Sequence, residues 1–173
     1  MGPTITCRAP TLQDGADMWR IAQAAGVDPN SPYKYLVFCR DFAETSVIAR
    51  AGDEAAGFVT GYRRPQAPDT LFVWQIAVLE TFRGAGVAGS MLAHLVDSLA
   101  PRGIAYVEAT VTPGNTASAR LFDGLATRRG VPCRREPLFD ASLFPVGHDA
   151  EILFRIGPLG SFRAPAGAPG SSA

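Results

Sequence analysis

A glycine-rich loop between a predicted strand and a predicted helix carries the clearest chemical signal in this sequence. Residues 71–78 are rich in β-branched and aromatic types, and residues 87–99 place apolar side chains at helical spacing. Between them lie one arginine and three glycines, Arg83, Gly84, Gly86 and Gly89. Glycine lets the backbone turn sharply and brings its amides close to a ligand. Because the first amides of a helix lie at the positive end of its dipole, this loop predicts a site for an anion such as pyrophosphate.

Two well-known phosphate loops fit less well. A P-loop requires a lysine after its last glycine, and none follows Gly86 or Gly89, which argues against a nucleoside triphosphatase. The spacing of Gly84, Gly86 and Gly89 approximates the dinucleotide-binding fingerprint Gly-x-Gly-x-x-Gly. That fingerprint belongs after the first strand of a βαβ unit, whereas this loop lies in the middle of the chain. A Rossmann-type oxidoreductase is therefore the rival interpretation, ahead of a plain structural turn.

Other polar residues could move a proton. Glu108 interrupts the apolar run 105–111, and a buried carboxylate is costly unless it points into a wet pocket or has a partner. This makes Glu108 the first candidate for a proton acceptor. His148 and Glu151 form a competing pair, because histidine titrates near neutral pH, although His148 could equally be a surface loop residue.

Length and composition restrict the class of protein. The chain has 173 residues, 47% of them hydrophobic, and a formal net charge of zero, which predicts one domain and no binding to nucleic acid. It contains no run of about 18 apolar residues and no signal-peptide pattern, so we expect a cytoplasmic protein without a membrane segment. Cys7, Cys39 and Cys133 are scattered and odd in number, which predicts buried free thiols and neither a disulfide framework nor a metal site.

The elements that must position these residues follow in a mixed order. Strands are predicted at 5–8, 45–50, 56–62, 71–78, 105–111 and 151–156. Helices are predicted at 11–26, 32–41, 87–99 and 116–128. The segment 63–69, with two prolines, is predicted to be a loop, and 130–139 to be irregular or a strand. This order predicts an α+β protein with a mixed central sheet, followed by a disordered Gly/Pro/Ala/Ser tail at 160–173.

The loop resembles the acetyl-CoA pyrophosphate loop of the GNAT acyltransferase superfamily. The motif Arg83-x-x-Gly86-x-Ala88 follows a strand ending in Ile-Ala-Val, and Asn115 opens the next helix. The resemblance implies a single GNAT N-acetyltransferase domain over 1–159 with acetyl-CoA as co-substrate and no metal. It also implies the cofactor-binding residues Ile76, Val78, Arg83, Gly84, Gly86, Val87, Ala88, Gly89 and Asn115.

Within that superfamily the chain is similar to the L-2,4-diaminobutyrate acetyltransferases of ectoine biosynthesis. The similar segments are 28–35, 57–62, 68–78, 108–113 and 144–155. The resemblance implies acetylation of the γ-amino group of diaminobutyrate, the step before ring closure to ectoine, a compatible solute made under osmotic stress. It also implies a homodimer. Two alternatives remain open: a GNAT enzyme for another small amine or amino acid, and a non-catalytic acetyl-CoA-binding module.

This reaction needs particular side chains. An aliphatic amine with a pKa near ~10 is neutral in only about one part in a thousand at pH 7, so it needs a proton acceptor, for which Glu108, His148 and Glu151 are the candidates. For the acceptor substrate the resemblance implies Asp28, Tyr33 and Trp74, where Asp28 could instead cap a helix and Tyr33 could simply pack.

The chain departs from the GNAT pattern at one catalytic position. Many GNATs carry a tyrosine acid on the helix at 116–128, where this chain has Leu121-Phe122, and Phe cannot donate a proton. Tyr33, Tyr35 and Tyr106 are the remaining tyrosine candidates, and no spacing favours one of them.

Overall fold

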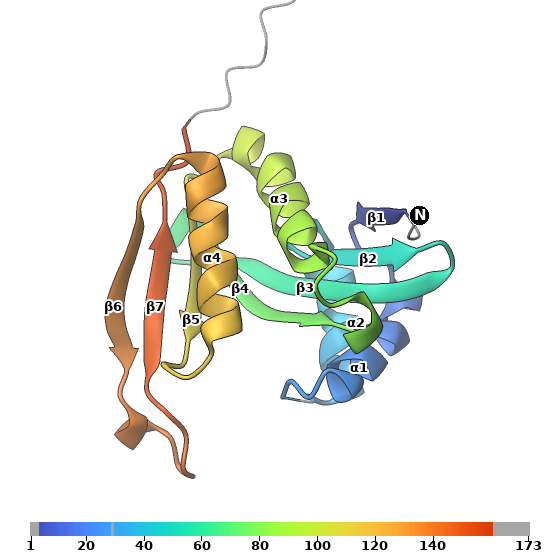
Figure 1. The fold of residues 1–173 in the computed structure, drawn as a ribbon, viewed down its shortest axis with the longest axis horizontal. Coiled ribbons are helices and arrows are strands. Elements are labelled where there is room, and N and C mark those ends of the chain that lie inside the picture. The colour runs from blue at the N-terminus through green and yellow to red at the C-terminus, as the bar shows by residue number, and fades with distance from the viewer. Residues whose placement is uncertain (1–3, 29, 161–173) are drawn as a thin grey trace, which may run out of the picture.

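The computed structural model describes residues 4–28 and 30–160 and contains a seven-stranded sheet (Figure 1). Its order is β1-β2-β3-β4-β5-β7-β6, and every neighbouring pair is antiparallel except β4 and β5. The strands are β1 (Ile5–Arg8), β2 (Val47–Ala51), β3 (Glu54–Arg64), β4 (Ala67–Val78), β5 (Tyr106–Val111), β6 (Cys133–Phe139) and β7 (Glu151–Ile156). The predicted α+β architecture with a mixed sheet is confirmed. The segment 130–139, predicted to be irregular or a strand, contains the strand β6.

Four helices cover the two faces of this sheet. They are α1 (Gly15–Ala24), α2 (Pro32–Asp41), α3 (Val87–Leu99) and α4 (Thr116–Arg129). Five short 3-10 helices lie at Leu12–Asp14, Ala43–Thr45, Glu80–Phe82, Ala100–Arg102 and Ala141–Leu143. Because strand side chains alternate between faces, Val59 packs in the core under α3 and α4, while Phe58 packs in a second core under α1 and α2.

The two helices predicted at 11–26 and 32–41 are present, and each begins with a capping residue. Thr11 and Asp14 form a capping box at the 3-10 turn that leads into α1. Ser31 caps α2 by accepting a hydrogen bond from the amide of Tyr33 at 3.3 Å, and Pro32 occupies the first helical turn.

The predicted loop at 63–69 is wrong. Strand β3 continues to Arg64 and β4 begins at Ala67, so only Pro65 and Gln66 form the turn. Pro68 is tolerated inside β4 because it lies near the start of that strand, next to a register shift in the β3–β4 ladder. The strand predicted from residue 45 also starts later, at Val47, because Thr45 belongs to a 3-10 turn.

Strands β4 and β5 pair only over a short distance. Thr70, Leu71 and Phe72 pair with Tyr106, Val107 and Glu108, and beyond Phe72 strand β4 pairs only with β3. The sheet therefore opens between β4 and β5.

Several expectations concern features away from this opening. Of the predicted tail, residues 161–173 lie outside the described part of the chain. None of the helices in the described ranges is long and apolar enough to cross a membrane. Residues 4–28 and 30–160 contain no cluster of three or more His, Cys, Asp or Glu suited to a metal ion. Cys39 is buried, which raises the pKa of its thiol to about 11, and Cys7 and Cys133 are half-buried.

Candidate active site

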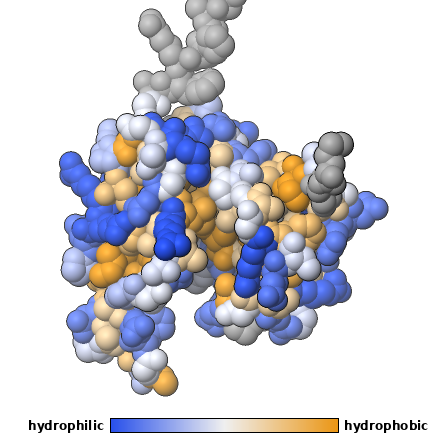
Figure 2. Space-filling model, in the orientation of Figure 1, coloured by the Kyte–Doolittle hydropathy of each residue, from blue (hydrophilic) through white to orange (hydrophobic). Residues whose placement is uncertain are grey.

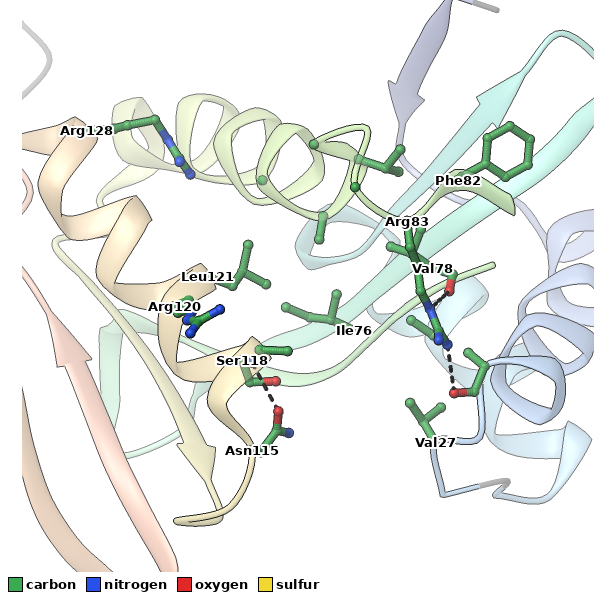
Figure 3. Close-up of a pocket in the computed structure, with 18 residues that line it drawn as sticks. Val27, Ile76, Val78, Phe82, Arg83, Asn115, Ser118, Arg120, Leu121 and Arg128 are labelled. Carbon is green, nitrogen blue, oxygen red and sulfur yellow. Dashed lines mark hydrogen bonds between the residues drawn. The ribbon is translucent and has the colours of Figure 1, made fainter. Parts of the chain in front are cut away.

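A cavity of about 710 Å³ lies where the sheet opens, between the end of β4 and the starts of α3 and α4 (Figure 3). It is lined by the nine residues that the resemblance assigned to the cofactor: Ile76, Val78, Arg83, Gly84, Gly86, Val87, Ala88, Gly89 and Asn115. We call it the cofactor cavity. Figure 2 shows a hydrophobic hollow in the middle of the molecule with hydrophilic side chains at its rim.

Two glycines shape the loop that borders this cavity. Gly84 and Gly86 have φ of 78° and 75°, a left-handed conformation that other residues adopt only with strain. Gly86 is the N-cap of α3, and the first intrahelical hydrogen bond runs from the amide of Ser90 to its carbonyl at 2.9 Å. The amides of Val87 and Ala88, which precede that bond, belong to the first turn, where a helix presents unpaired donors. The loop thus has the conformation that an anion site requires.

The charged residues lining the cofactor cavity are all arginines. They are Arg83, Arg120 and Arg128, and no acidic residue among those described lines it. Sequence reasoning missed Arg120 and Arg128, which come from α4. In the structure, Gly89 and Gly124 leave space for Arg128, since a Cβ on either would come within 3.5 Å of its guanidinium. A cationic lining suits a ligand that carries phosphate groups.

Arg83 also ties the loop to the end of α1. Its Nη2 donates to the carbonyl of Ala25 at 3.1 Å and its Nε to that of Val78 at 3.3 Å (Figure 3). Because its guanidinium already donates to two carbonyls, Arg83 would contribute to an anion site through its main-chain amide as well as through its positive charge.

Asn115 is a helix cap and a cavity residue at once. Its Oδ1 accepts from the amide of Ser118 at 3.0 Å, and the residue also lines the cofactor cavity. At the position where many GNATs carry a tyrosine acid, Phe122 is buried in the core and Leu121 faces the cavity. None of the described residues lining this cavity is a tyrosine.

A second cavity, of about 760 Å³, opens on the other side of β4. Asp28, Trp74, Glu108 and Glu151 line it, together with one arginine, Arg64, and the aromatic residues Tyr62, Phe72, Phe139 and Phe144. We call it the acidic cavity. The structure does not bring Tyr33 to it, because that side chain is 70% exposed and lines neither cavity.

Glu108 is buried on the floor of the acidic cavity and held by two arginines. Its Oε2 accepts from Arg64 at 2.9 Å, and its Oε1 accepts from Arg155. Both conditions raised by the sequence therefore hold, a pocket and a partner. Each oxygen of Glu108 therefore already accepts a charge-assisted hydrogen bond from a guanidinium.

Glu151 has one carboxylate oxygen, Oε2, that accepts no hydrogen bond from the described residues. This oxygen is buried, although buried polar atoms are nearly always paired. Its Oε1 lies 3.7 Å from Nε2 of His148, whose ring stacks on Phe144 with centroids 4.1 Å apart. His148 is not among the residues that line the cavity, but it lies next to Glu151, which is.

Trp74 forms one wall of the acidic cavity and already has a cation beside it. Nζ of Lys34 lies 4.9 Å from the centre of the Trp74 ring, and the ring centroids of Phe38 and Tyr62 each lie 6.2 Å from that of Trp74. The family resemblance implied Trp74 for the acceptor substrate, whereas nothing in the sequence indicated its lysine partner.

A model of the GNAT acetyltransferase family matches residues 15–125, which include both the glycine loop and the start of α4. The chain belongs to the GNAT family of acetyltransferases.

Two curated GNAT relatives are similar over nearly the whole chain. The L-2,4-diaminobutyric acid acetyltransferase of Streptomyces coelicolor is 53% identical over 154 residues, covering 87% of this chain and 91% of that protein. The enzyme of the same name from Nocardia farcinica is 48% identical over 157 residues, covering 90% of this chain and 81% of that protein. Within the GNAT family, the chain therefore belongs to the diaminobutyrate acetyltransferases.

A solved GNAT structure agrees with this. The diaminobutyrate acetyltransferase of Paenibacillus lautus, in complex with L-2,4-diaminobutyric acid and coenzyme A, superposes with a TM-score of 0.87 at 38% identity. The match covers 91% of this chain and 97% of that one. The GNAT fold expected from the sequence is thereby confirmed.

Proposed function

We propose that this protein transfers the acetyl group of acetyl-CoA to the γ-amino group of L-2,4-diaminobutyrate, the reaction named for its relatives and a step of ectoine biosynthesis. One observation carries the proposal from family to site. Strand β4 lines the cofactor cavity with Ile76 and Val78 and the acidic cavity with Phe72 and Trp74. An anionic cofactor and a cationic amine can therefore approach each other across one strand.

The acceptor side has the charges that this substrate requires. Diaminobutyrate carries two ammonium groups and one carboxylate. In the acidic cavity Asp28 and Glu151 are carboxylates that bond to no arginine within residues 4–28 and 30–160, and Arg64 keeps donors beyond the one that binds Glu108. We assign Asp28 to an ammonium group and Trp74 to the wall along the aliphatic chain. Tyr33 stays a prediction of the family resemblance.

The simplest reaction transfers the acetyl group directly from the thioester to the amine, without an acyl-enzyme intermediate. The neutral γ-nitrogen forms a bond to the thioester carbonyl carbon, the carbon–sulfur bond breaks, and the sulfur leaves as CoA thiolate. The proton lost by the amine passes to Glu151, with His148 beside it. Glu108, our first candidate, is less suited because both its oxygens are engaged by arginines. Backbone amides of Ile76 and Val78 would polarise the carbonyl.

The assembly and location are inferred from the same resemblance. We expect a homodimer in the cytoplasm, where acetyl-CoA is available. The acceptor-site carboxylates argue for an acetyltransferase rather than for a module that only holds acetyl-CoA, because such a module needs no site for an amine.

Thiol release from acetyl-CoA should be measured with diaminobutyrate, ornithine and lysine as acceptors. We expect the highest kcat/KM with diaminobutyrate, and acetyl on the γ-nitrogen alone by NMR of the product. Asp28→Asn keeps the size of the side chain and removes its charge, so it should raise the KM for diaminobutyrate at least about tenfold and leave that for acetyl-CoA nearly unchanged. Equal rates with all three amines would point to the broader amine acetyltransferase, and no release to the binding module.

A further inference from the structure

The boundary between the two cavities is built from two segments that line both. On β4, Ile76 lines the cofactor cavity and Trp74 the acidic cavity. In the segment after α1, Val27 lines the cofactor cavity and Asp28 the acidic cavity. The distance between these segments therefore sets how the acceptor side faces the thioester side.

On the acceptor side, the side chain of Gln75 connects the two segments. Gln75, the residue between Trp74 and Ile76, donates from Nε2 to the carbonyl of Asp28 at 2.9 Å. That carbonyl also accepts from the main-chain amide of Asn30 at 3.0 Å. The same carboxamide accepts, through Oε1, from the hydroxyl of Tyr35 at 2.9 Å.

Tyr35 fixes which way the Gln75 carboxamide points. Its side chain is fully buried and packs edge-on against Phe58 with ring centroids 5.6 Å apart, so its hydroxyl has little freedom. Burial raises the pKa of Tyr35, so the hydroxyl stays protonated and acts as a donor at neutral pH. A donor at that place requires the oxygen of the carboxamide, and the NH₂ group is thereby directed to Asp28.

The segment after α1 has a second attachment that does not involve Gln75. Arg83 holds the carbonyl of Ala25, three residues before Asp28, on the cofactor side. Loss of the Gln75 contact would therefore release the acceptor end of the segment and leave the cofactor end attached.

We infer that Gln75 is a positioning residue: oriented by Tyr35, it holds the main chain of Asp28 against β4 and so sets the approach of the acceptor amine to the thioester. This rests on the proposed function for its kinetic test, but not for its structural test. Gln75 itself touches neither reacting group in the proposed reaction.

The test compares two variants of Gln75. Gln75→Met has similar length and loses both hydrogen bonds, while Gln75→Glu keeps the acceptor for Tyr35 and loses the donor to Asp28. We expect each to lower kcat/KM for diaminobutyrate by about five- to tenfold or more, as for one lost hydrogen bond, with acetyl-CoA affinity within about twofold of wild type. Gln23→Met, on the exposed side of α1, is the matched control and should behave as wild type.

Amide hydrogen exchange supplies the structural test. The amide of Asn30 should exchange faster in both Gln75 variants than in wild type, whether or not diaminobutyrate is the substrate. Unchanged exchange at Asn30 would overturn the inference, as would equal losses of affinity for both substrates. If exchange changes but wild-type protein does not acetylate diaminobutyrate, the proposed function fails and the positioning role stands.

Discussion

Lys34 places a positive charge inside the aromatic wall of the acidic cavity. Its Nζ is buried without a hydrogen-bond partner among the described residues and lies over the Trp74 ring. Burial lowers the pKa of Lys34 to about 8, and the nearby charge of Asp28 opposes that shift. A substrate ammonium near Trp74 would meet this cation, which favours binding it on the side of Asp28 and Glu151.

The burial of Lys34 predicts a pH-dependent stability. Its pKa is about 8 in the folded protein and 10.5 when unperturbed, so between these values the unfolded chain binds more protons. The free energy of unfolding should therefore rise with pH across this window. Lys34→Met removes the term, so it should raise the Tm at pH 7, and its advantage over wild type should shrink as the pH approaches 10.5. Calorimetric melts at pH 7, 8.5 and 10 provide the measurement, and a pH-independent difference would contradict the explanation.

Residue chemistry was predictable from the sequence where it depends on neighbours along the chain. The glycines and the caps belong to this class. The partners of Glu108 do not, since Arg64 and Arg155 lie 44 and 47 positions away and come from different strands. Only the sheet register brings them together, with Arg155 directly opposite Glu108.

At the scale of elements, the junction of β4 and α3 depends on a backbone conformation. Gly86 ends the loop and caps the helix with φ of 75°, and a Cβ placed there would meet no atom within 4 Å. A larger residue at this position is therefore limited by backbone strain and by the ligand it would obstruct.

A comparison of Gly86→Val with a control variant, Gly52→Val, should separate backbone strain from obstruction of the ligand. The strain of a left-handed residue costs about 1–2 kcal/mol, and we expect acetyl-CoA to bind more than about tenfold more weakly because the valine obstructs the amides of α3. Gly52→Val has the same strain in the β2–β3 turn, with φ of 61° and open space, but lies outside the cofactor cavity. Calorimetric titration should show weakened binding only for Gly86→Val. Equal affinities in the two folded variants would remove the pyrophosphate assignment.

Element types followed from periodicity, and the errors arose where a local signal was ambiguous. Two prolines in seven residues suggested a loop at 63–69, yet the turn has only two residues. Pro68 can lie within β4 because the register shift in the β3–β4 ladder means that no amide is required there to donate to β3. The sequence of 130–139 is compatible with an irregular segment or a strand, because it lacks a regular alternation of apolar and polar residues, and in the structure β6 is mostly exposed. Pairing with β7 stabilises it instead, which no property of residues 133–139 alone indicates.

Across the whole molecule, charge is sorted between the two cavities although the net charge is zero. Arginines line the cofactor cavity, and three carboxylates with one arginine line the acidic cavity. The formal net charge could not predict this separation, which depends on the fold bringing α4 beside α3 and β7 beside β5.

The arginine lining predicts a salt-sensitive cofactor affinity. Arg128→Ala should raise the KM for acetyl-CoA by about five- to tenfold, the effect of losing one charge-assisted contact to a phosphate. Because salt screens partly exposed charges, the KM of wild type should rise with ionic strength, and the variant should respond less steeply. Arg134→Ala, an exposed arginine on β6, is the control. Identical salt slopes for wild type and Arg128→Ala would show that this arginine does not contact the cofactor.

The early end of the β4–β5 pairing has a consequence for self-association. Unpaired strand edges usually lie at the border of a sheet, where they invite strands from other molecules and promote aggregation. Here an unpaired edge lies in the middle of the sheet, past Phe72, with β5 closing one end of the wedge. The cofactor cavity lies at this opening and is lined by Ile76 and Val78 of β4, so a ligand in the cavity would cover the edge that β5 leaves unpaired. The unpaired edge therefore borders a cavity within the sheet and not the outer border, where strands of other molecules usually add.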